Sequence, residues 1–259
     1  MTLVAVDRLT KVFSGTTDVM ALDSVTLNVG AGEFVSLIGP SGCGKSTLLH
    51  ILDGLTPASG GQVLVDGRPV DGPGPDRAMV FQEYALLPWR TVQANVELGL
   101  ELRGMPAAER RRISSDLINL VGLRGFESRY PHELSGGMRQ RVSIARALAL
   151  DPKILLMDEP FANLDAQTRL LLEEELLTIW QRTGKTVLFV THDLAEAIAM
   201  ADRVVIFTAR PGRIKDVVPV PLPRPRDVVR IRTTPEFARL YDHLWTQLRD
   251  EVMKSREVA

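Results

Sequence analysis

The sequence contains little cysteine, little net charge and no long apolar run. It holds one cysteine, Cys43, in 259 residues, so no disulfide can form within the chain, and this fits a reducing compartment. The formal net charge is −1, so no overall field attracts nucleic acid or anionic lipid. No apolar run approaches the roughly 18 residues that span a bilayer, and the N-terminal residues lack a secretory signal pattern. We therefore expect no nucleic-acid partner and, at a membrane, only a peripheral role.

The distribution of apolar residues predicts an α/β fold. Apolar residues make up 45% of the chain, which is enough for a substantial core. Helical stretches separate short β-branched apolar segments at 34–38, 154–157, 187–190 and 204–207. Strands that alternate with helices imply a mostly parallel core sheet that helices cover on both faces.

Three further parts are expected around this sheet. Runs of β-prone residues between 3 and 29, with a polar turn between them, are typical of an N-terminal antiparallel β subdomain. Residues from about 91 to 150 predict a helical subdomain inserted in the α/β lobe. We therefore expect one domain over 1–230 and a C-terminal helical extension over 231–259. Thr234 and Pro235 suit the start of that helix, and its apolar stripe favours packing on the domain over an external partner.

The stretch GPSGCGKST, residues 39–47, follows the apolar run 34–38 directly. Its spacing, G-x-x-x-x-G-K-S, predicts a phosphate-binding loop. Glycines let the backbone curl so that N–H groups point at phosphate oxygens. Lys45 would place its charge on the outer phosphates, Ser46 could hold a magnesium ion, and the N-terminus of the next helix favours the same anion. A turn would explain the glycines and the proline, but not the lysine.

Cys43 lies inside this loop, beside the predicted helix N-terminus. A thiol at such a position tends to have a lowered pKa. Because the loop uses backbone groups to bind phosphate, we favour a role for Cys43 as a small spacer. Even so, we expect a thiol reagent to block nucleotide binding and nucleotide to protect Cys43.

Two adjacent acids, Asp158 and Glu159, follow the apolar run 154–157. A phosphate-binding loop leaves two tasks open. One is a second anchor for magnesium, which suits Asp158, and the other is a base that orients and deprotonates an attacking water, which suits Glu159. Neighbouring side chains of an extended chain diverge, so two acids can serve two targets. A solvated strand end is the alternative, which the phosphate-binding loop makes the weaker interpretation.

The stretch LSGGMRQR, residues 134–141, precedes a predicted helix over 142–150. Ser135 can cap that helix, but capping does not explain two exposed glycines, Gly136 and Gly137, at a helix start. Bare N–H groups there would form a second anion site, although the chain holds one phosphate-binding loop. A dimer would account for both anion sites, if residues 134–141 of each chain closed over nucleotide bound to the other chain.

Together these motifs resemble those of the ATP-binding cassette (ABC) family. LSGGMRQR resembles the family's signature sequence, and the phosphate-binding loop, ILLMDE, Gln82, NLD at 163–165 and His192 match its motifs in content and order. The resemblance covers about residues 1–230. It implies a P-loop NTPase fold and a head-to-tail homodimer that sandwiches two ATP molecules, with Mg²⁺.

The resemblance also implies roles for single residues. Gln82 would sense magnesium and water and contact a membrane partner, and His192 would contact the γ-phosphate; without the resemblance, each would be an ordinary polar side chain. The catalytic residues would be Glu159, His192 and Gln82, and the magnesium ligands Ser46, Gln82 and Asp158. The ATP-binding residues would be Phe13, Gly39, Pro40, Ser41, Gly42, Cys43, Gly44, Lys45, Ser46 and Thr47.

Other implied roles concern the dimer. Ser135, Gly136 and Gly137 would face the partner chain's γ-phosphate, and Asp165 would lie in the loop that crosses the dimer interface. Two positions depart from the family pattern. Phe13 stands where a tyrosine often stacks on adenine and keeps the stacking face. Asn163 is bulkier than the alanine that is commoner there, which can change packing across the dimer.

The branch of the family is indicated by FQEYALLPWRTVQANVELGL, residues 81–100. It looks like the importer branch, most closely the subunits that serve nitrate, sulfonate, taurine and related small anions. Leu86, Leu87 and Trp89 would line a groove for a short permease helix, although Trp89 could instead be buried in the helical part. The alternative function is a soluble ABC-type ATPase that is not coupled to transport.

The importer interpretation also implies partners and a location. The chain would hydrolyse ATP as a homodimer that drives integral-membrane permease subunits, with a separate solute-binding protein. It would lie peripherally at the cytoplasmic face of the cell membrane. The transported solute would be chosen by those partners, so this sequence does not identify it.

Overall fold

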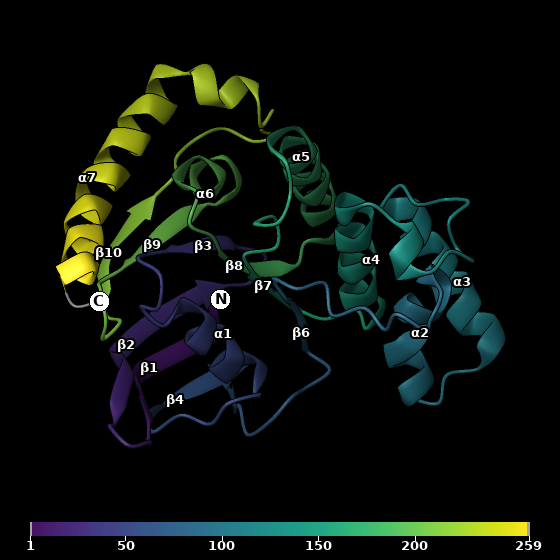
Figure 1. The fold of residues 1–259 in the computed structure, drawn as a ribbon, viewed down its shortest axis with the longest axis horizontal. Helices are drawn as coiled ribbons and strands as arrows, with labels where there is room; N and C mark the ends of the chain where they lie inside the picture. The colour runs from purple at the N-terminus through teal and green to yellow at the C-terminus, as the bar shows by residue number, and fades with distance from the viewer. Residues whose placement is uncertain (1, 258–259) are drawn as a thin grey trace. The chain divides into compact units, whose positions relative to one another are not determined.

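The computed structural model describes residues 2–257, drawn as a ribbon in Figure 1. The chain divides into two compact units. The first unit combines Met1–Gly74 with Gly184–Ala259, and the second is Pro75–Thr183.

An antiparallel sheet opens the first unit, with strand order β2-β1-β4-β5. Its strands are β1 (Thr2–Phe13), β2 (Val19–Gly30), β4 (Gly60–Val65) and β5 (Arg68–Pro69). Along β2, Val25, Leu27 and Val29 are buried and alternate with exposed residues, as expected for a sheet with one face on the core. The predicted N-terminal antiparallel sheet is confirmed.

The same unit contains strands that pair mainly in parallel. β3 (Phe34–Ile38) pairs in parallel with β8 (Thr186–Val190) and with β9 (Arg203–Phe207), and β10 (Ile214–Pro219) pairs antiparallel to β9. Every residue of β3 and β8 is buried. Continuous apolar runs are typical of parallel strands that are covered on both faces, so the predicted mostly parallel sheet is confirmed.

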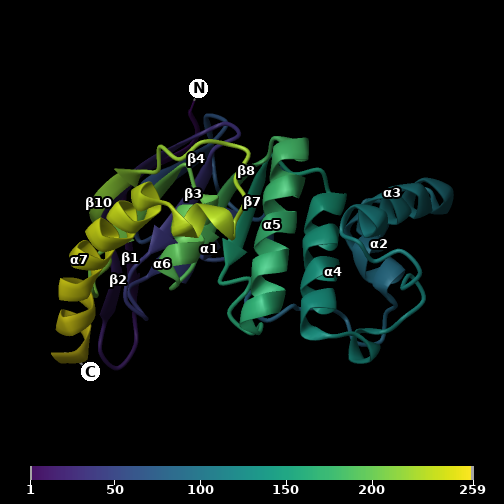
Figure 2. The same ribbon diagram turned by 90° about the horizontal axis from the view of Figure 1, so that it is seen from above.

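Helices complete the first unit. α1 (Lys45–Asp53) follows β3, α6 (Leu194–Met200) follows β8, and a 3₁₀ turn, η2 (Arg230–Thr233), precedes α7 (Pro235–Glu257). Figures 1 and 2 show α7 beside α6 and β10. The hydroxyl of Thr234 accepts a hydrogen bond from the Phe237 backbone N–H at 3.3 Å, so the start of this helix lies where the sequence predicts it.

The second unit contains two parallel strands and four α-helices. The strands are β6 (Arg77–Val80) and β7 (Ile154–Asp158); the helices are α2 (Val92–Leu102), α3 (Ala107–Leu120), α4 (Gly136–Ala149) and α5 (Ala166–Thr183), with a 3₁₀ turn η1 (Pro131–Glu133). Figure 2 shows α2 and α3 together, with α4 between them and α5. Within residues 2–257, no helix has the length and apolar character needed to cross a bilayer.

The extended segment before α7 is fixed by one buried arginine. Arg226 is 6% exposed. Its guanidinium donates to the carbonyls of Ile198, Ala199 and Ala201 at the end of α6, and to those of Val220 and Leu222 in its own segment, at 2.6–3.2 Å. A cation near a helix C-terminus also interacts favourably with the helix dipole. Arg226 therefore ties the segment to α6.

We expect Arg226→Leu to lower the free energy of unfolding by about 3 kcal/mol, because it leaves buried carbonyl groups without a donor. Urea unfolding followed by circular dichroism would measure this loss. Arg230→Leu is the matched control, since the Arg230 side chain is 89% exposed and its loss should change stability by less than about 0.5 kcal/mol. Equal stability of the two variants would contradict the role of Arg226.

Candidate functional site

The predicted phosphate-binding loop connects β3 to α1 in the first unit. Lys45 is the first residue of α1 and is 6% exposed. Its ammonium donates to the carbonyls of Gly39 and Pro40 at 2.8 and 2.9 Å, and it lies 3.6 Å from the Cys43 sulfur. A buried charge needs partners, and here the loop supplies them. The loop therefore curls around its own lysine.

Glycine is required at the N-terminus of α1. Gly44 has φ of 105°, a conformation that side chains rarely adopt. A Cβ atom at this position would lie 2.7 Å from the Ala21 carbonyl oxygen and from Leu22. The loop therefore packs its backbone directly on β2. Ser46 and Thr47, the next two residues of α1, are half-buried.

The thiol of Cys43 does not have the lowered pKa that its position beside a helix N-terminus suggests. Cys43 is 1% exposed. Burial raises the pKa of the thiol above its usual value, and this outweighs the lowering effect of the neighbouring Lys45 ammonium. The expected lowering of this pKa is therefore wrong, because the sulfur lies inside the loop and not at its surface. The role of a small spacer fits this position.

Phe13 lies at the end of β1, paired with Val19 of β2. It is 46% exposed, and the Lys11 ammonium lies 4.9 Å from the centre of its ring. An exposed aromatic face is able to stack on a base. A cation at this distance from an aromatic ring makes a cation–π interaction, which helps hold the ring in place.

His192 lies between β8 and α6 and is exposed. The next residue, Asp193, caps α6 by accepting hydrogen bonds from the backbone N–H groups of Ala195 and Glu196. The Thr191 hydroxyl accepts from the Asp193 N–H at 3.0 Å. The backbone on the C-terminal side of His192 is thus fixed while its side chain stays accessible.

In the second unit, Asp158 ends β7 and is 9% exposed. The following residue, Glu159, is half-buried and has φ of 44°. Such a conformation is uncommon for a residue with a side chain, and strain of this kind is often found at functional sites. Strand β7 therefore ends at Asp158, and the backbone turns out of the strand at Glu159.

Gln82 lies after β6 and is exposed. The loop that follows it is held to two helices. Arg146 of α4 donates to the carbonyls of Ala85 and Tyr84 at 2.6 and 3.2 Å. Asn95 of α2 is fully buried; it accepts from the Leu87 N–H and donates to the carbonyls of residues 87, 90 and 91. The loop over residues 82–91 is therefore firmly attached.

Trp89 projects from this loop and is 71% exposed. Leu86 and Leu87, nearby in the same loop, are half-buried. Burial of Trp89 in the helical part, the alternative considered from sequence, is therefore wrong. An exposed tryptophan on a loop that is fixed at several points is typical of a contact surface for another protein.

The signature stretch begins α4. Ser135 caps the helix, because its hydroxyl accepts from the Met138 N–H at 3.3 Å. Gly137, expected to be exposed, is buried, and a Cβ atom there would lie 2.7 Å from a methyl group of Thr168. Close packing against α5 therefore explains this glycine in the single chain. Gly136 is half-buried and Ser135 is exposed, so these two can face another molecule.

Asp165 is exposed and precedes α5. Its carboxylate accepts from the backbone N–H groups of Thr168 and Gln167 at 3.0 and 3.2 Å. Hydrogen bonds from Thr168 hold the pKa of Asp165 below its usual value. Two residues earlier, the Asn163 amide donates to the Gln82 carbonyl at 3.4 Å. This bond joins the Asp165 loop to the Gln82 loop, and alanine at position 163 could not make it.

Sequence patterns did not identify Asn95 or Arg146. Asn95 is the one polar side chain among the inward-facing residues of α2, and that is a weak signal of a structural role. Arg146 lies 61 residues from the carbonyl of Ala85 that it binds. No local pattern predicts such a contact.

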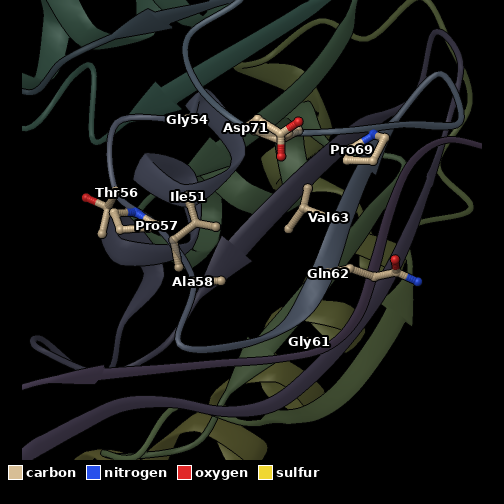
Figure 3. Close-up of a pocket in the computed structure, with 11 residues that line it drawn as sticks. Ile51, Gly54, Thr56, Pro57, Ala58, Gly61, Gln62, Val63, Pro69 and Asp71 are labelled. Atoms are coloured by element: carbon tan, nitrogen blue, oxygen red, sulfur yellow. The ribbon is translucent and has the colours of Figure 1, made fainter.

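A separate cavity lies between the C-terminal end of α1 and strand β4 (Figure 3). Its volume is about 370 Å³, and its lining includes Ile51, Val63 and Pro69 with the polar side chains of Gln62 and Asp71. None of the predicted site residues lines it. It is therefore distinct from the phosphate-binding loop.

Comparison with known proteins agrees with the motifs. A family profile described as ABC transporter matches residues 22–162. The chain is 56% identical over 251 residues to an uncharacterized ABC transporter ATP-binding protein, MJ0412, of Methanocaldococcus jannaschii, covering 96% of this chain and 92% of that protein. It is 45% identical to the nitrate import ATP-binding protein NrtD of a Synechocystis species, over 96% of each chain.

A solved structure is also similar. The dimeric ATP-binding cassette MJ0796, in a post-hydrolysis state bound to ADP and Pi, is 34% identical and superposes with a TM-score of 0.75. The match covers 84% of this chain and 99% of that one. This likeness confirms the predicted P-loop NTPase fold class.

The buried Cys43 should react slowly with thiol reagents. Burial removes access, and the raised pKa leaves less thiolate at any given pH than a free cysteine has. We expect iodoacetamide at pH 8 to label the native chain at least about tenfold more slowly than the urea-unfolded chain. The native rate should still be rising with pH above the usual thiol range.

The matched control moves the thiol by two residues. In the double variant Cys43→Ala/Ser41→Cys, the thiol occupies an exposed position of the same loop and should react rapidly. Equally fast labelling of the native wild-type chain would contradict the burial of Cys43.

Proposed function

Because the chain belongs to the ABC transporter family and is an ATPase of that family, we propose that it is the energy-coupling subunit of an importer for a small anion. Two copies would close over two ATP molecules and drive a membrane permease. The observation that carries the transport part is Trp89, which is 71% exposed on a loop that Asn95 and Arg146 hold in place.

ATP binding is assigned to the loop over Gly39–Thr47. Lys45 already lies inside this loop, held by the Gly39 and Pro40 carbonyls, so the β- and γ-phosphates would meet a positioned charge. Backbone N–H groups at the start of α1 would bind the same phosphates. Phe13, with its exposed face, would stack on adenine.

The magnesium ligands proposed are Ser46, Asp158 and Gln82. They offer a hydroxyl, a carboxylate and an amide oxygen, and oxygen donors of this kind suit Mg²⁺. No cluster of three or more His, Cys, Asp or Glu side chains suited to a metal occurs within residues 2–257, so the ion would depend on phosphate and water for its other ligands. Bound there, Mg²⁺ would neutralise charge on the phosphates.

Hydrolysis would use Glu159, His192 and Gln82. Glu159 would orient the attacking water and accept its proton. Glu159 has φ of 44° and follows strand β7, which ends at Asp158; we assign the water to the carboxylate of Glu159 and the ion to that of Asp158. The exposed His192 would contact the γ-phosphate, and Gln82 would contact the water and the ion.

The proposed clamp requires two chains. Ser135 and Gly136 are accessible at the start of α4, where a helix N-terminus attracts anions. They would contact the γ-phosphate held by the partner chain, with Gly137 behind them and Asp165 in the interface loop. The dimeric state of the MJ0796 cassette supports this assembly. Hydrolysis would remove the contacts that join the chains, so the two dimer states differ in stability.

The permease would dock at the loop that carries Trp89. Trp89, with the half-buried Leu86 and Leu87 beside it in the sequence, would offer an apolar surface to a short amphipathic helix. Gln82 lies at the start of the same loop, and Arg146 on the signature helix binds that loop. Movement at the nucleotide would thus be transmitted to the permease through a firmly attached segment.

The cargo class is proposed from similarity. NrtD, at 45% identity, is a nitrate import ATP-binding protein, so we propose nitrate, a sulfonate, taurine or a related small anion. A separate solute-binding protein would select it. The chain would lie peripherally at the cytoplasmic face of the cell membrane.

We expect Glu159→Gln to reduce ATP hydrolysis by at least about a hundredfold, because the base that deprotonates water is lost. ATP would still bind, so the chain should accumulate as an ATP-bound dimer. Phosphate release would measure hydrolysis, and gel filtration with light scattering would measure mass. A monomer at saturating ATP would contradict the clamp.

The matched control adds Ser135→Arg to Glu159→Gln. This double variant should bind ATP with unchanged affinity but stay monomeric, because Ser135 serves the nucleotide of the other chain. Loss of ATP binding by the isolated double variant would instead mean that Ser135 belongs to its own chain's site.

Trp89→Ala tests the coupling to transport. The variant should keep its own ATPase activity, because none of the roles proposed at the nucleotide uses Trp89. Its affinity for the permease should fall at least about tenfold. Reconstitution with the permease in proteoliposomes would measure both quantities. Leu102→Ala, at an 81% exposed position on the C-terminal end of α2, is the control. If Trp89→Ala left binding and transport unchanged, an ATPase not coupled to transport would be the better account.

A further inference from the structure

The loop between β9 and β10, residues 208–213, is closed by its own hydrogen bonds. The Thr208 N–H donates to the Arg213 carbonyl at 2.9 Å. The Thr208 hydroxyl donates to the Pro211 carbonyl and accepts from the Arg213 N–H, both at 3.0 Å. These hydrogen bonds give the 208–213 loop a fixed shape, so the loop can hold in place the residues that it contacts.

This 208–213 loop lies directly on the phosphate-binding loop, within the first unit. The Arg210 guanidinium donates through Nε to the Gly42 carbonyl at 3.3 Å. A Cβ atom on Gly212 would lie 2.0 Å from the Cys43 carbonyl oxygen, so only glycine permits this approach. Gly212 also exchanges backbone hydrogen bonds with residues 21 and 23 of β2, which fixes its position.

The other side of the 208–213 loop is held by α7. The Ala209 N–H donates to one carboxylate oxygen of Glu251 at 3.0 Å. The other oxygen accepts from Lys215 and Lys254, both at 3.0 Å. Lys215 also donates to the Gln247 carbonyl of α7 at 2.7 Å. The carboxylate is therefore the point at which α7, β10 and the loop meet.

Glu251 is well suited to a permanent anchor. It is 3% exposed. Burial by itself would raise the pKa of this carboxyl, but the hydrogen bonds from Ala209, Lys215 and Lys254 outweigh burial and lower the pKa to about 2. The group is thus ionised throughout the neutral range. None of the functional roles described above uses it.

We propose that Arg210 is a positioning residue for the phosphate-binding loop, and that Glu251 of α7 holds the loop that presents Arg210, so that α7 contributes to nucleotide affinity. The peptide unit is planar, so holding the Gly42 carbonyl also holds the N–H of Cys43. The inference rests on the proposed ATP site at Gly39–Thr47. Arg210 acts on the loop and not on the nucleotide.

The first measurement is ATP affinity by fluorescence with a labelled ATP analogue. Arg210→Ala should raise the Kd about three- to tenfold, the range that corresponds to one hydrogen bond. KM should rise by a similar factor while kcat changes less than about twofold, because the loop binds substrate and transition state alike. Arg210→Lys should recover part of the affinity. A fall in kcat at unchanged KM would overturn the assignment.

The matched control is Arg213→Ala. Arg213 lies in the same loop, but its side chain pairs with Asp23 and not with the phosphate-binding loop. Its Kd should stay within about twofold of wild type. An equal loss in Arg213→Ala and Arg210→Ala would mean that positive charge near the site matters and positioning does not, and that would overturn the proposal.

A double-mutant cycle tests the link to α7. Glu251→Gln should raise the Kd about threefold in the wild-type chain and should have a clearly smaller effect in the Arg210→Ala chain, because both changes act through the 208–213 loop. Arg239→Gln, on the exposed face of α7, should have no effect. Additive effects of the two changes would overturn the link. Thermal unfolding of each variant shows that the chain is folded.

The Lys45→Ala variant distinguishes a wrong role for Arg210 from a wrong assignment of the ATP site. Lys45→Ala should abolish ATP binding in the same assay. If the wild-type chain bound no ATP, or if Lys45→Ala bound it normally, the site at Gly39–Thr47 would be wrong. If Lys45→Ala lost binding while Arg210→Ala kept it, the site would stand and the role of Arg210 would be wrong.

Discussion

The burial of one charge, the ammonium of Lys45, is the constraint on which the phosphate-binding loop of the first unit depends. A buried cation needs acceptors, and the carbonyls of Gly39 and Pro40 provide them at 2.8 and 2.9 Å. To bring those carbonyls inward the loop must curl tightly, and this leaves no room for side chains where it meets β2 at Gly44. Phosphate oxygens are the natural competitors for the same ammonium. The loop is therefore already arranged around the charge that an anion would use.

Several of the predicted functional residues share one structural origin, although they are divided between the two units. The phosphate-binding loop follows β3, His192 follows β8, Gln82 follows β6, and Asp158 ends β7. Each lies at the carboxyl end of a parallel strand, where loops of α/β proteins bind ligands. The strands are buried and fixed, so the loops that follow them can carry strained or exposed residues such as Glu159 and Trp89. The rigid strands thus hold in place the loop residues to which functional roles are assigned.

Local patterns predicted much of this arrangement. Apolar strands and the spacing of glycine and lysine are short-range signals, so the α/β class, the loop after β3 and the cap at Ser135 could be read from sequence. The errors lie where distant residues decide. Gly137 is buried by Thr168 on another helix. The Cys43 thiol has a raised pKa because it is enclosed. Neither the enclosure of a single glycine or thiol nor a contact across 61 residues leaves a periodic signal.

The C-terminal helix, α7, has a buried contact at Glu251 that a periodic apolar pattern does not reveal. Phe237, Leu244 and Leu248 of its apolar stripe lie in the interior, whereas Tyr241 on the same face is 42% exposed. An apolar stripe alone would permit the helix to slide along its partner. Glu251 removes that freedom, because its carboxylate binds Ala209 and Lys215, which lie outside α7, and a shifted helix would lose both contacts. Replacing a buried ionic group by an apolar one is often neutral or stabilising, so the need for stability does not account for a carboxylate here. A fixed register does account for it, since register determines where α7 holds the loop that touches Gly42.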